Sequence, residues 1–163
     1  MPRLRKTWRE KLADDKDLPR VVEITERMSR RWGKGTVVIP APREVDEIMR
    51  RVPRGRLLTI NQIRETVARK HGATIGCPIT CGIFAGIAAR AAEECAAEGG
   101  GAEGGADITP YWRTLKSGGE LNPRYPGGVE AQAARLEAEG HTIDRGRKMP
   151  RVQDYEGKLV EVD

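Results

Sequence analysis

The chain has 163 residues, enough for one domain with appendages and for a core that needs no disulfide or metal support. No run approaches the roughly eighteen apolar residues of a membrane span, and the arginine-rich amino end lacks the apolar run of a signal peptide, so we expect a cytoplasmic protein without a membrane partner. Residues 1–60 carry sixteen Lys/Arg against nine Asp/Glu within a chain of formal net charge +5. Positive charge gathered at one end favours a polyanionic partner, with simple solubility as the alternative.

The amino-terminal third contains short predicted elements. Residues 3–14 are highly charged and predict a marginal helix or a mobile arm. Apolar residues from Val21 to Trp32 fall at helical spacing and predict a helix that ends at Gly33 and docks on the domain. Residues 36–39 predict a short extended run. An apolar stripe from Val45 to Val52 then predicts a helix that Pro53 stops.

Two further helices follow in the order of a helix-turn-helix. Thr59 and Gln62 fit a capping box, and Gly72 suits a carboxyl-terminal cap, so a helix is predicted between them. A second, Ala/Gly-rich helix is predicted from Pro78 to about residue 98. Its glycines, at 82 and 86, allow close approach of another helix or of a groove wall, and both interpretations stay open. Residues 99–106 predict a flexible linker.

Two segments resemble the O6-alkylguanine-DNA alkyltransferase family. Residues 109–140, TPYWRTLKSGGELNPRYPGGVEAQAARLEAEG, are similar to the family's Pro-Cys-His-Arg-Val active-site segment with the lid and helix that follow it. Residues 52–63, VPRGRLLTINQI, are similar to its entry into the helix-turn-helix. The resemblance covers about residues 43–145. It implies an α/β, mainly α, winged-helix-like DNA-binding domain at 42–145, with a basic extension at 1–41 and a tail at 146–163.

Two of the three residues that carry the family's chemistry are changed in this sequence. Tyr111 replaces the acceptor cysteine and Trp112 replaces the histidine, while Glu139 matches the glutamate. A phenol is a poor alkyl acceptor at neutral pH, and an indole cannot act as its base. Ile60 and Ile83 stand where the resemblance places the tyrosine and arginine that flip the nucleotide.

The resemblance therefore implies a DNA binder that lacks catalysis, as in the cysteine-less alkyltransferase-like proteins, which mark O6-alkylguanine for nucleotide excision repair. An aromatic cavity could stack an extruded base, or the rings could plug a disused pocket. An apolar wedge could enter a base step from Ile83 or Phe84, although both residues would also suit a core. The predicted pocket consists of Pro110, Tyr111, Trp112, Tyr125 and Glu139, and the predicted structural motif of Arg113, Gly127 and Gly128. The predicted DNA contacts are Arg50, Arg51, Arg54, Arg56, Thr59, Asn61, Thr80, Ile83 and Phe84.

Two other functions stay open. Cys77 and Cys81 are four residues apart and could serve a redox or metal role, although small buried thiols explain them as well. We expect no cofactor and no metal. A scaffold that binds RNA or protein, using the amino-terminal arm and residues 145–148, is the alternative to a DNA binder, since a fold does not dictate a function.

Overall fold

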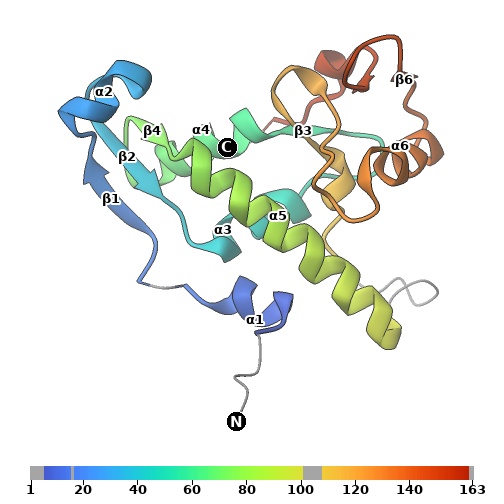
Figure 1. Cartoon of the computed structure of the whole chain (residues 1–163), viewed down its shortest axis with the longest axis horizontal. Coiled ribbons are helices and arrows are strands. Elements are labelled where there is room, and N and C mark those ends of the chain that lie inside the picture. The colour runs from blue at the N-terminus through green and yellow to red at the C-terminus, as the bar shows by residue number, and fades with distance from the viewer. Residues whose placement is uncertain (1–5, 16, 101–107, 162–163) are drawn as a thin grey trace.

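The computed structural model describes residues 6–15, 17–100 and 108–161, and the fold is mixed α/β and mainly helical (Figure 1). The long helix α5 runs across the molecule, with α3 and α4 packed behind it. Within the described residues, no helix is both long and apolar enough to cross a bilayer. The α-helices are α1 Trp8–Ala13, α2 Glu26–Trp32, α3 Pro42–Arg50, α4 Ile60–His71, α5 Pro78–Cys95 and α6 Gly128–Ala138.

The strands are short and form three small sheets. In the first sheet, β2 pairs antiparallel with β1 and parallel with β4; β3 pairs parallel with β5, and β6 antiparallel with β7. Their bounds are β1 Arg20–Glu23, β2 Thr36–Ile39, β3 Leu58–Thr59, β4 Ile75–Gly76, β5 Thr114–Leu115, β6 Ile143–Asp144 and β7 Arg151–Val152. A π-helical turn Ala96–Gly100 follows α5, and 3₁₀ turns occupy Tyr111–Arg113, Ser117–Gly119 and Tyr155–Lys158.

The predicted helix from Val21 to Trp32 is wrong in its first half. Residues 20–23 form β1, which pairs residue by residue with β2, and the helix begins only after Thr25, whose side chain accepts a hydrogen bond from the Met28 amide. The adjacent β-branched residues Val21 and Val22 suit a strand, and a threonine cap favours a new helix start. The helix α2 has no buried residue, so it does not dock an apolar face on the domain.

The helix-turn-helix order is present at α4 and α5. Thr59 and Gln62 form the predicted capping box, and Gly72 ends α4 in the left-handed conformation at φ +65°. The core lies beneath both helices, where Ile63 and Val67 are fully buried. Residues 101–106 of the predicted linker lie outside the described residues.

Candidate nucleic-acid groove

A groove of about 920 Å³ runs along the exposed side of α5. One part of its lining comes from α5 itself, another from residues 114–116 and 122–125, and a third from α1, which Figure 1 shows beside α5. Ile60, in the position that the resemblance assigned to a nucleotide-contacting tyrosine, also lines it. The groove therefore joins α5, the second helix of the helix-turn-helix, to the segment that follows residues 110–113.

The α5 face in this groove is apolar, and at Gly82 and Gly86 it carries no side chain. Ile79 and Ile83 are 59% and 53% exposed, among the most exposed large apolar side chains of the described chain. A Cβ added at Gly82 or Gly86 would meet nothing within 4 Å. The two glycines therefore do not serve close packing among the described residues, and they leave room for something outside them.

The two candidate wedge residues, Ile83 and Phe84, differ in solvent exposure. Ile83 lines the groove from an exposed position, whereas Phe84 is 8% exposed and belongs to the hydrophobic core, touching the groove only as part of its lining. An exposed isoleucine on a helix face costs hydration free energy unless something covers it. Of the two, Ile83 is the side chain available to an external partner.

The groove is bordered by basic residues that the sequence did not single out. Lys116 and Arg124 come from the segment between β5 and α6 on one side of α5, and Lys11 comes from α1 on the other side, where Arg90 of α5 lies near Trp8. None of the four forms an ion pair within the described part of the chain. Lys116 and Arg124 precede the segment Tyr125–Val129 that resembles the family's lid, Arg124 directly, and that position is the signal that the sequence offers for them. Asp14, the one acidic residue among the described residues of the lining, is paired with Lys6 at 2.6 Å.

The four arginines predicted to contact phosphate lie elsewhere. None of them lines the groove. Arg50 Nε donates to Asp46 at 2.9 Å, and Arg54 donates to the Ala138 carbonyl at 2.8 Å. Arg56 is exposed, and Arg51 borders a second, smaller pocket.

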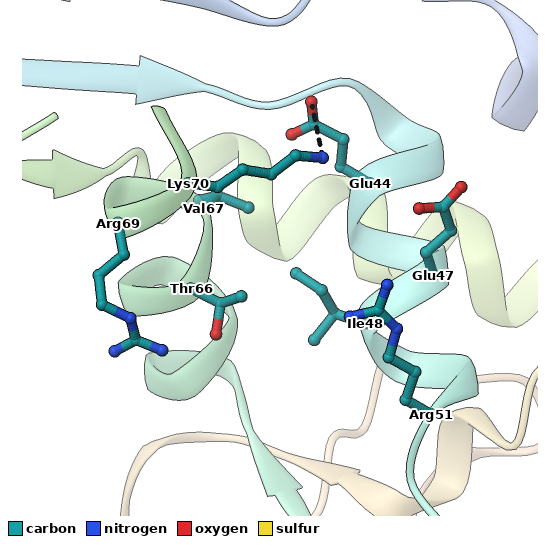
Figure 2. Close-up of a pocket in the computed structure, with 8 residues that line it drawn as sticks. All are labelled: Glu44, Glu47, Ile48, Arg51, Thr66, Val67, Arg69 and Lys70. Atoms are coloured by element: carbon teal, nitrogen blue, oxygen red, sulfur yellow. Dashed lines mark ion pairs between the residues drawn. The ribbon is translucent and has the colours of Figure 1, made fainter. Parts of the chain in front are cut away.

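That second pocket, of about 410 Å³, lies between α3 and α4 (Figure 2). Figure 2 shows Lys70 of α4 directed toward Glu44 of α3, with Glu47 and Arg51 at the α3 side of the pocket and Arg69 at the α4 side. The Lys70 ammonium lies 3.9 Å from the Glu44 carboxylate, and the His71 ring lies 3.0 Å from the same group. Two carboxylates among the cations make this pocket a poorer match for a polyanion than the α5 groove.

The three polar residues predicted to contact DNA differ in their solvent exposure. Thr59 is 6% exposed, and its hydroxyl caps α4. Asn61 is partly exposed and donates to the Ser117 hydroxyl at 3.2 Å. The Thr80 hydroxyl is buried, without a hydrogen-bond partner among the described residues, and Thr80 does not line the groove.

The predicted aromatic residues do lie together. The Tyr111 ring meets the rings of Trp112 and Tyr125 edge to face, each with a centroid distance of 5.3 Å. All three rings are buried, as is Pro110, and of the rings only Tyr125 lines the groove. Tyr111 and Trp112 therefore fill their own site, and the open space lies beside them at Tyr125.

The Tyr111 hydroxyl is held away from reaction. It donates to Glu93 at 3.0 Å, and Glu93 also accepts from Arg135 at the same distance. Burial and the nearby Glu93 carboxylate raise the pKa of Tyr111 above its ordinary value. The phenol therefore stays protonated at neutral pH.

Glu139 forms an ion pair in the interior with Arg113. Its carboxylate accepts from Arg113 Nη2 at 2.9 Å and from Trp112 Nε1 at 2.8 Å, and its side chain is 4% exposed. Burial opposes its ionisation, but the hydrogen bonds from Arg113 and Trp112 lower the pKa of Glu139. Arg113 also donates to the Val52 carbonyl at 2.8 Å, which ties the motif to the chain leaving α3.

The two motif glycines begin α6 in the left-handed region. Gly127 has φ +81° and Gly128 φ +75°. A Cβ at Gly127 would lie 2.6 Å from the Ala131 Cβ, so both conformation and space favour glycine there. This turn brings Tyr125 to the groove immediately before α6.

The cysteines lie apart from the groove. Cys77 and Cys81 are buried, and burial raises the pKa of Cys81 to about 12. Among the residues that the structure describes, no group of three or more His, Cys, Asp or Glu side chains is arranged to hold a metal. None of the three cysteines is among the described residues that line the groove.

Comparison with protein-family models finds no matching family, and comparison with curated proteins finds no match. The chain is similar to a solved structure of S. pombe Atl1 in complex with damaged DNA containing O6-carboxymethylguanine. The identity is 19% and the TM-score 0.49, over 74% of this chain and 94% of that chain. The groove, its basic borders and the open space at Gly82 and Gly86 are features of this chain itself.

Proposed function

We propose that the chain binds duplex DNA along α5 without catalysis, and that it senses a modified base such as O6-alkylguanine and marks it for repair. The observation that carries the DNA proposal is the open α5 face, with Gly82, Ile83 and Gly86, between two borders of cations that form no ion pair within the described chain. A duplex presents a backbone of negative charge on each side of every groove. The helix face then meets the groove floor while the cations meet phosphate.

The altered motif supports binding without alkyl transfer. A nucleophilic acceptor must be ionised and accessible, whereas the Tyr111 phenol is buried, protonated and hydrogen-bonded to Glu93. None of the described residues that line the groove is a cysteine. An O6-alkylguanine held beside Tyr125 would therefore keep its alkyl group.

The proposal is tested by fluorescence anisotropy with duplex DNA, single-stranded DNA and RNA over a salt series. We expect a duplex preference and a steep salt dependence, and Lys116→Ala/Arg124→Ala should reduce the log–log slope by about 0.9 for each phosphate that is no longer neutralised. The matched control is Arg27→Ala/Lys34→Ala, which removes the same charge from exposed positions outside the groove. Absence of binding to any nucleic acid, or equal effects of the two double variants, would contradict the proposal.

Lesion recognition is tested with two duplexes that differ by a single O6-methylguanine. We expect tighter binding of the modified duplex, with no change in the mass of the chain after incubation. Equal affinities would leave a DNA binder without lesion recognition. A methyl adduct on the protein would show that the chain is catalytic after all.

A further inference from the structure

The Glu94 carboxylate, in the carboxyl-terminal half of α5, accepts three hydrogen bonds from the short helix α1. Glu94 of α5 accepts from the backbone amides of Trp8 and Arg9, at 3.0 and 3.2 Å, and from Arg9 Nε at 3.1 Å. Arg9 also pairs with Glu98. Hydrogen bonds to backbone amides specify position more closely than a contact between two flexible side-chain ends, so Glu94 sets where α1 lies.

Two cations on this side are organised by an indole ring. The Lys11 ammonium lies 4.1 Å and the Arg90 guanidinium 5.2 Å from the centroid of Trp8. The ring attracts both without neutralising either, because its quadrupole carries no net charge. All three side chains line the groove. With cations already over the indole, Trp8 is poorly placed to stack a base, and the cations are available for an anion.

Helix α1 lines the groove on the opposite side of α5 from the segment that carries Lys116 and Arg124, the cations already proposed to contact DNA. In Figure 1, α1 lies on one side of α5, and the chain between β5 and α6 lies on the other. A helix with its side chains is about 10–12 Å across. Cations on both sides of such a helix can therefore reach two backbones at once.

Resting on the proposed function, we infer that α1 is a wall of the DNA site. Lys11 and Arg90 contact the phosphates of one strand, while Lys116 and Arg124 contact those of the other. Glu94 is a positioning residue that holds this wall in place. Helix α1, within the amino-terminal extension, is thus part of the binding surface, and the ligand group on this side is a sugar-phosphate backbone.

The test uses the sign of a charge change in the full chain. Glu94→Ala removes a negative charge, which by electrostatics alone would strengthen binding to DNA. If Glu94 positions α1, the variant should instead bind duplex DNA several-fold more weakly. Glu65→Ala is the matched control, because it removes the same charge from an exposed position on α4 that does not line the groove, and it should bind as tightly as the wild type or more tightly.

A second variant separates the loss of a DNA contact from a defect in folding. Lys11→Ala changes a partly exposed side chain and should lower the salt slope by about 0.9 relative to the wild type, with unchanged thermal unfolding. If Lys116→Ala/Arg124→Ala weakens binding while Glu94→Ala and Lys11→Ala do not, the α1 inference fails and the proposed function stands. If the wild type does not bind duplex DNA, both fail.

Discussion

At the scale of single residues, the segment from Tyr111 to Arg113 is held in place by interactions with Glu139. Glu139 and Arg113 form an ion pair that is almost wholly enclosed, and the Trp112 indole uses the same carboxylate as its acceptor. Removing one member of such a pair leaves the other charged and unpaired in the interior. The residues that the resemblance associates with chemistry thus contribute here to holding the segment before β5 in place.

The ion pair predicts a stability difference between two neighbouring glutamates. Glu139→Ala should lower the free energy of unfolding by about 3 kcal/mol, because it strands Arg113. Glu137→Ala removes an exposed carboxylate that pairs with Arg145 and should cost much less. Urea unfolding of both variants measures the difference. Similar decreases for the two variants would show that the Arg113 pair is not a buried interaction of this strength.

At the scale of elements, α5 combines a buried face and an unusual exposed one. Its inner side packs alanines and Phe84 into the core, while its outer side carries two glycines with open space where a side chain would be. Glycine in a helix interior costs about 1 kcal/mol relative to alanine. No packing among the described residues offsets this cost, and the missing side chains leave room on this face for a partner.

This face predicts opposite effects on stability and binding. Gly82→Ala should raise the free energy of unfolding by about 1 kcal/mol, since the added methyl group meets no neighbour and improves helix propensity. The same methyl should weaken duplex binding by keeping α5 from the groove floor. Thermal unfolding and anisotropy on one preparation test both. Unchanged affinity would remove Gly82 from the proposed contact surface.

At the scale of the whole molecule, residues before the predicted domain are integrated with it. The strand β2 is the middle strand of its sheet and joins β1 to β4, and its Val38 is fully buried in the core. The carboxyl-terminal residues also pair with the body, through β6 with β7 and through Leu57 with Leu159. Chain segments outside 42–145 therefore contribute to one structure.

Truncation should expose this dependence. Removing residues 1–41 deletes β2 and leaves β4 without its partner, so the remaining chain should no longer unfold cooperatively in circular dichroism. Removing residues 1–14 deletes α1 and keeps β1 and β2, and it should leave a cooperative transition. If both truncated chains unfold alike, β2 is not the strand that holds the sheet to the domain.

Features that depend on a few neighbouring residues are predictable from the sequence alone. The Thr59 cap and the Gly72 terminus of α4 follow from local hydrogen bonding and from glycine's access to positive φ, and the structure confirms both. The clustering of Tyr111, Trp112 and Tyr125 was predicted from the resemblance, and the absence of the reactive thiol is visible in the letters alone.

Features that depend on distant partners required the folded chain. Val21 and Val22 form a strand because β2 lies beside them, although their spacing with later residues is helical. Which side of α5 faces solvent, and which cations border its groove, depends on where residues 114–125 and α1 pack. Local preferences amount to fractions of a kcal/mol per residue, whereas burial and strand pairing act between residues far apart in the chain, so they select among structures that the local pattern leaves open.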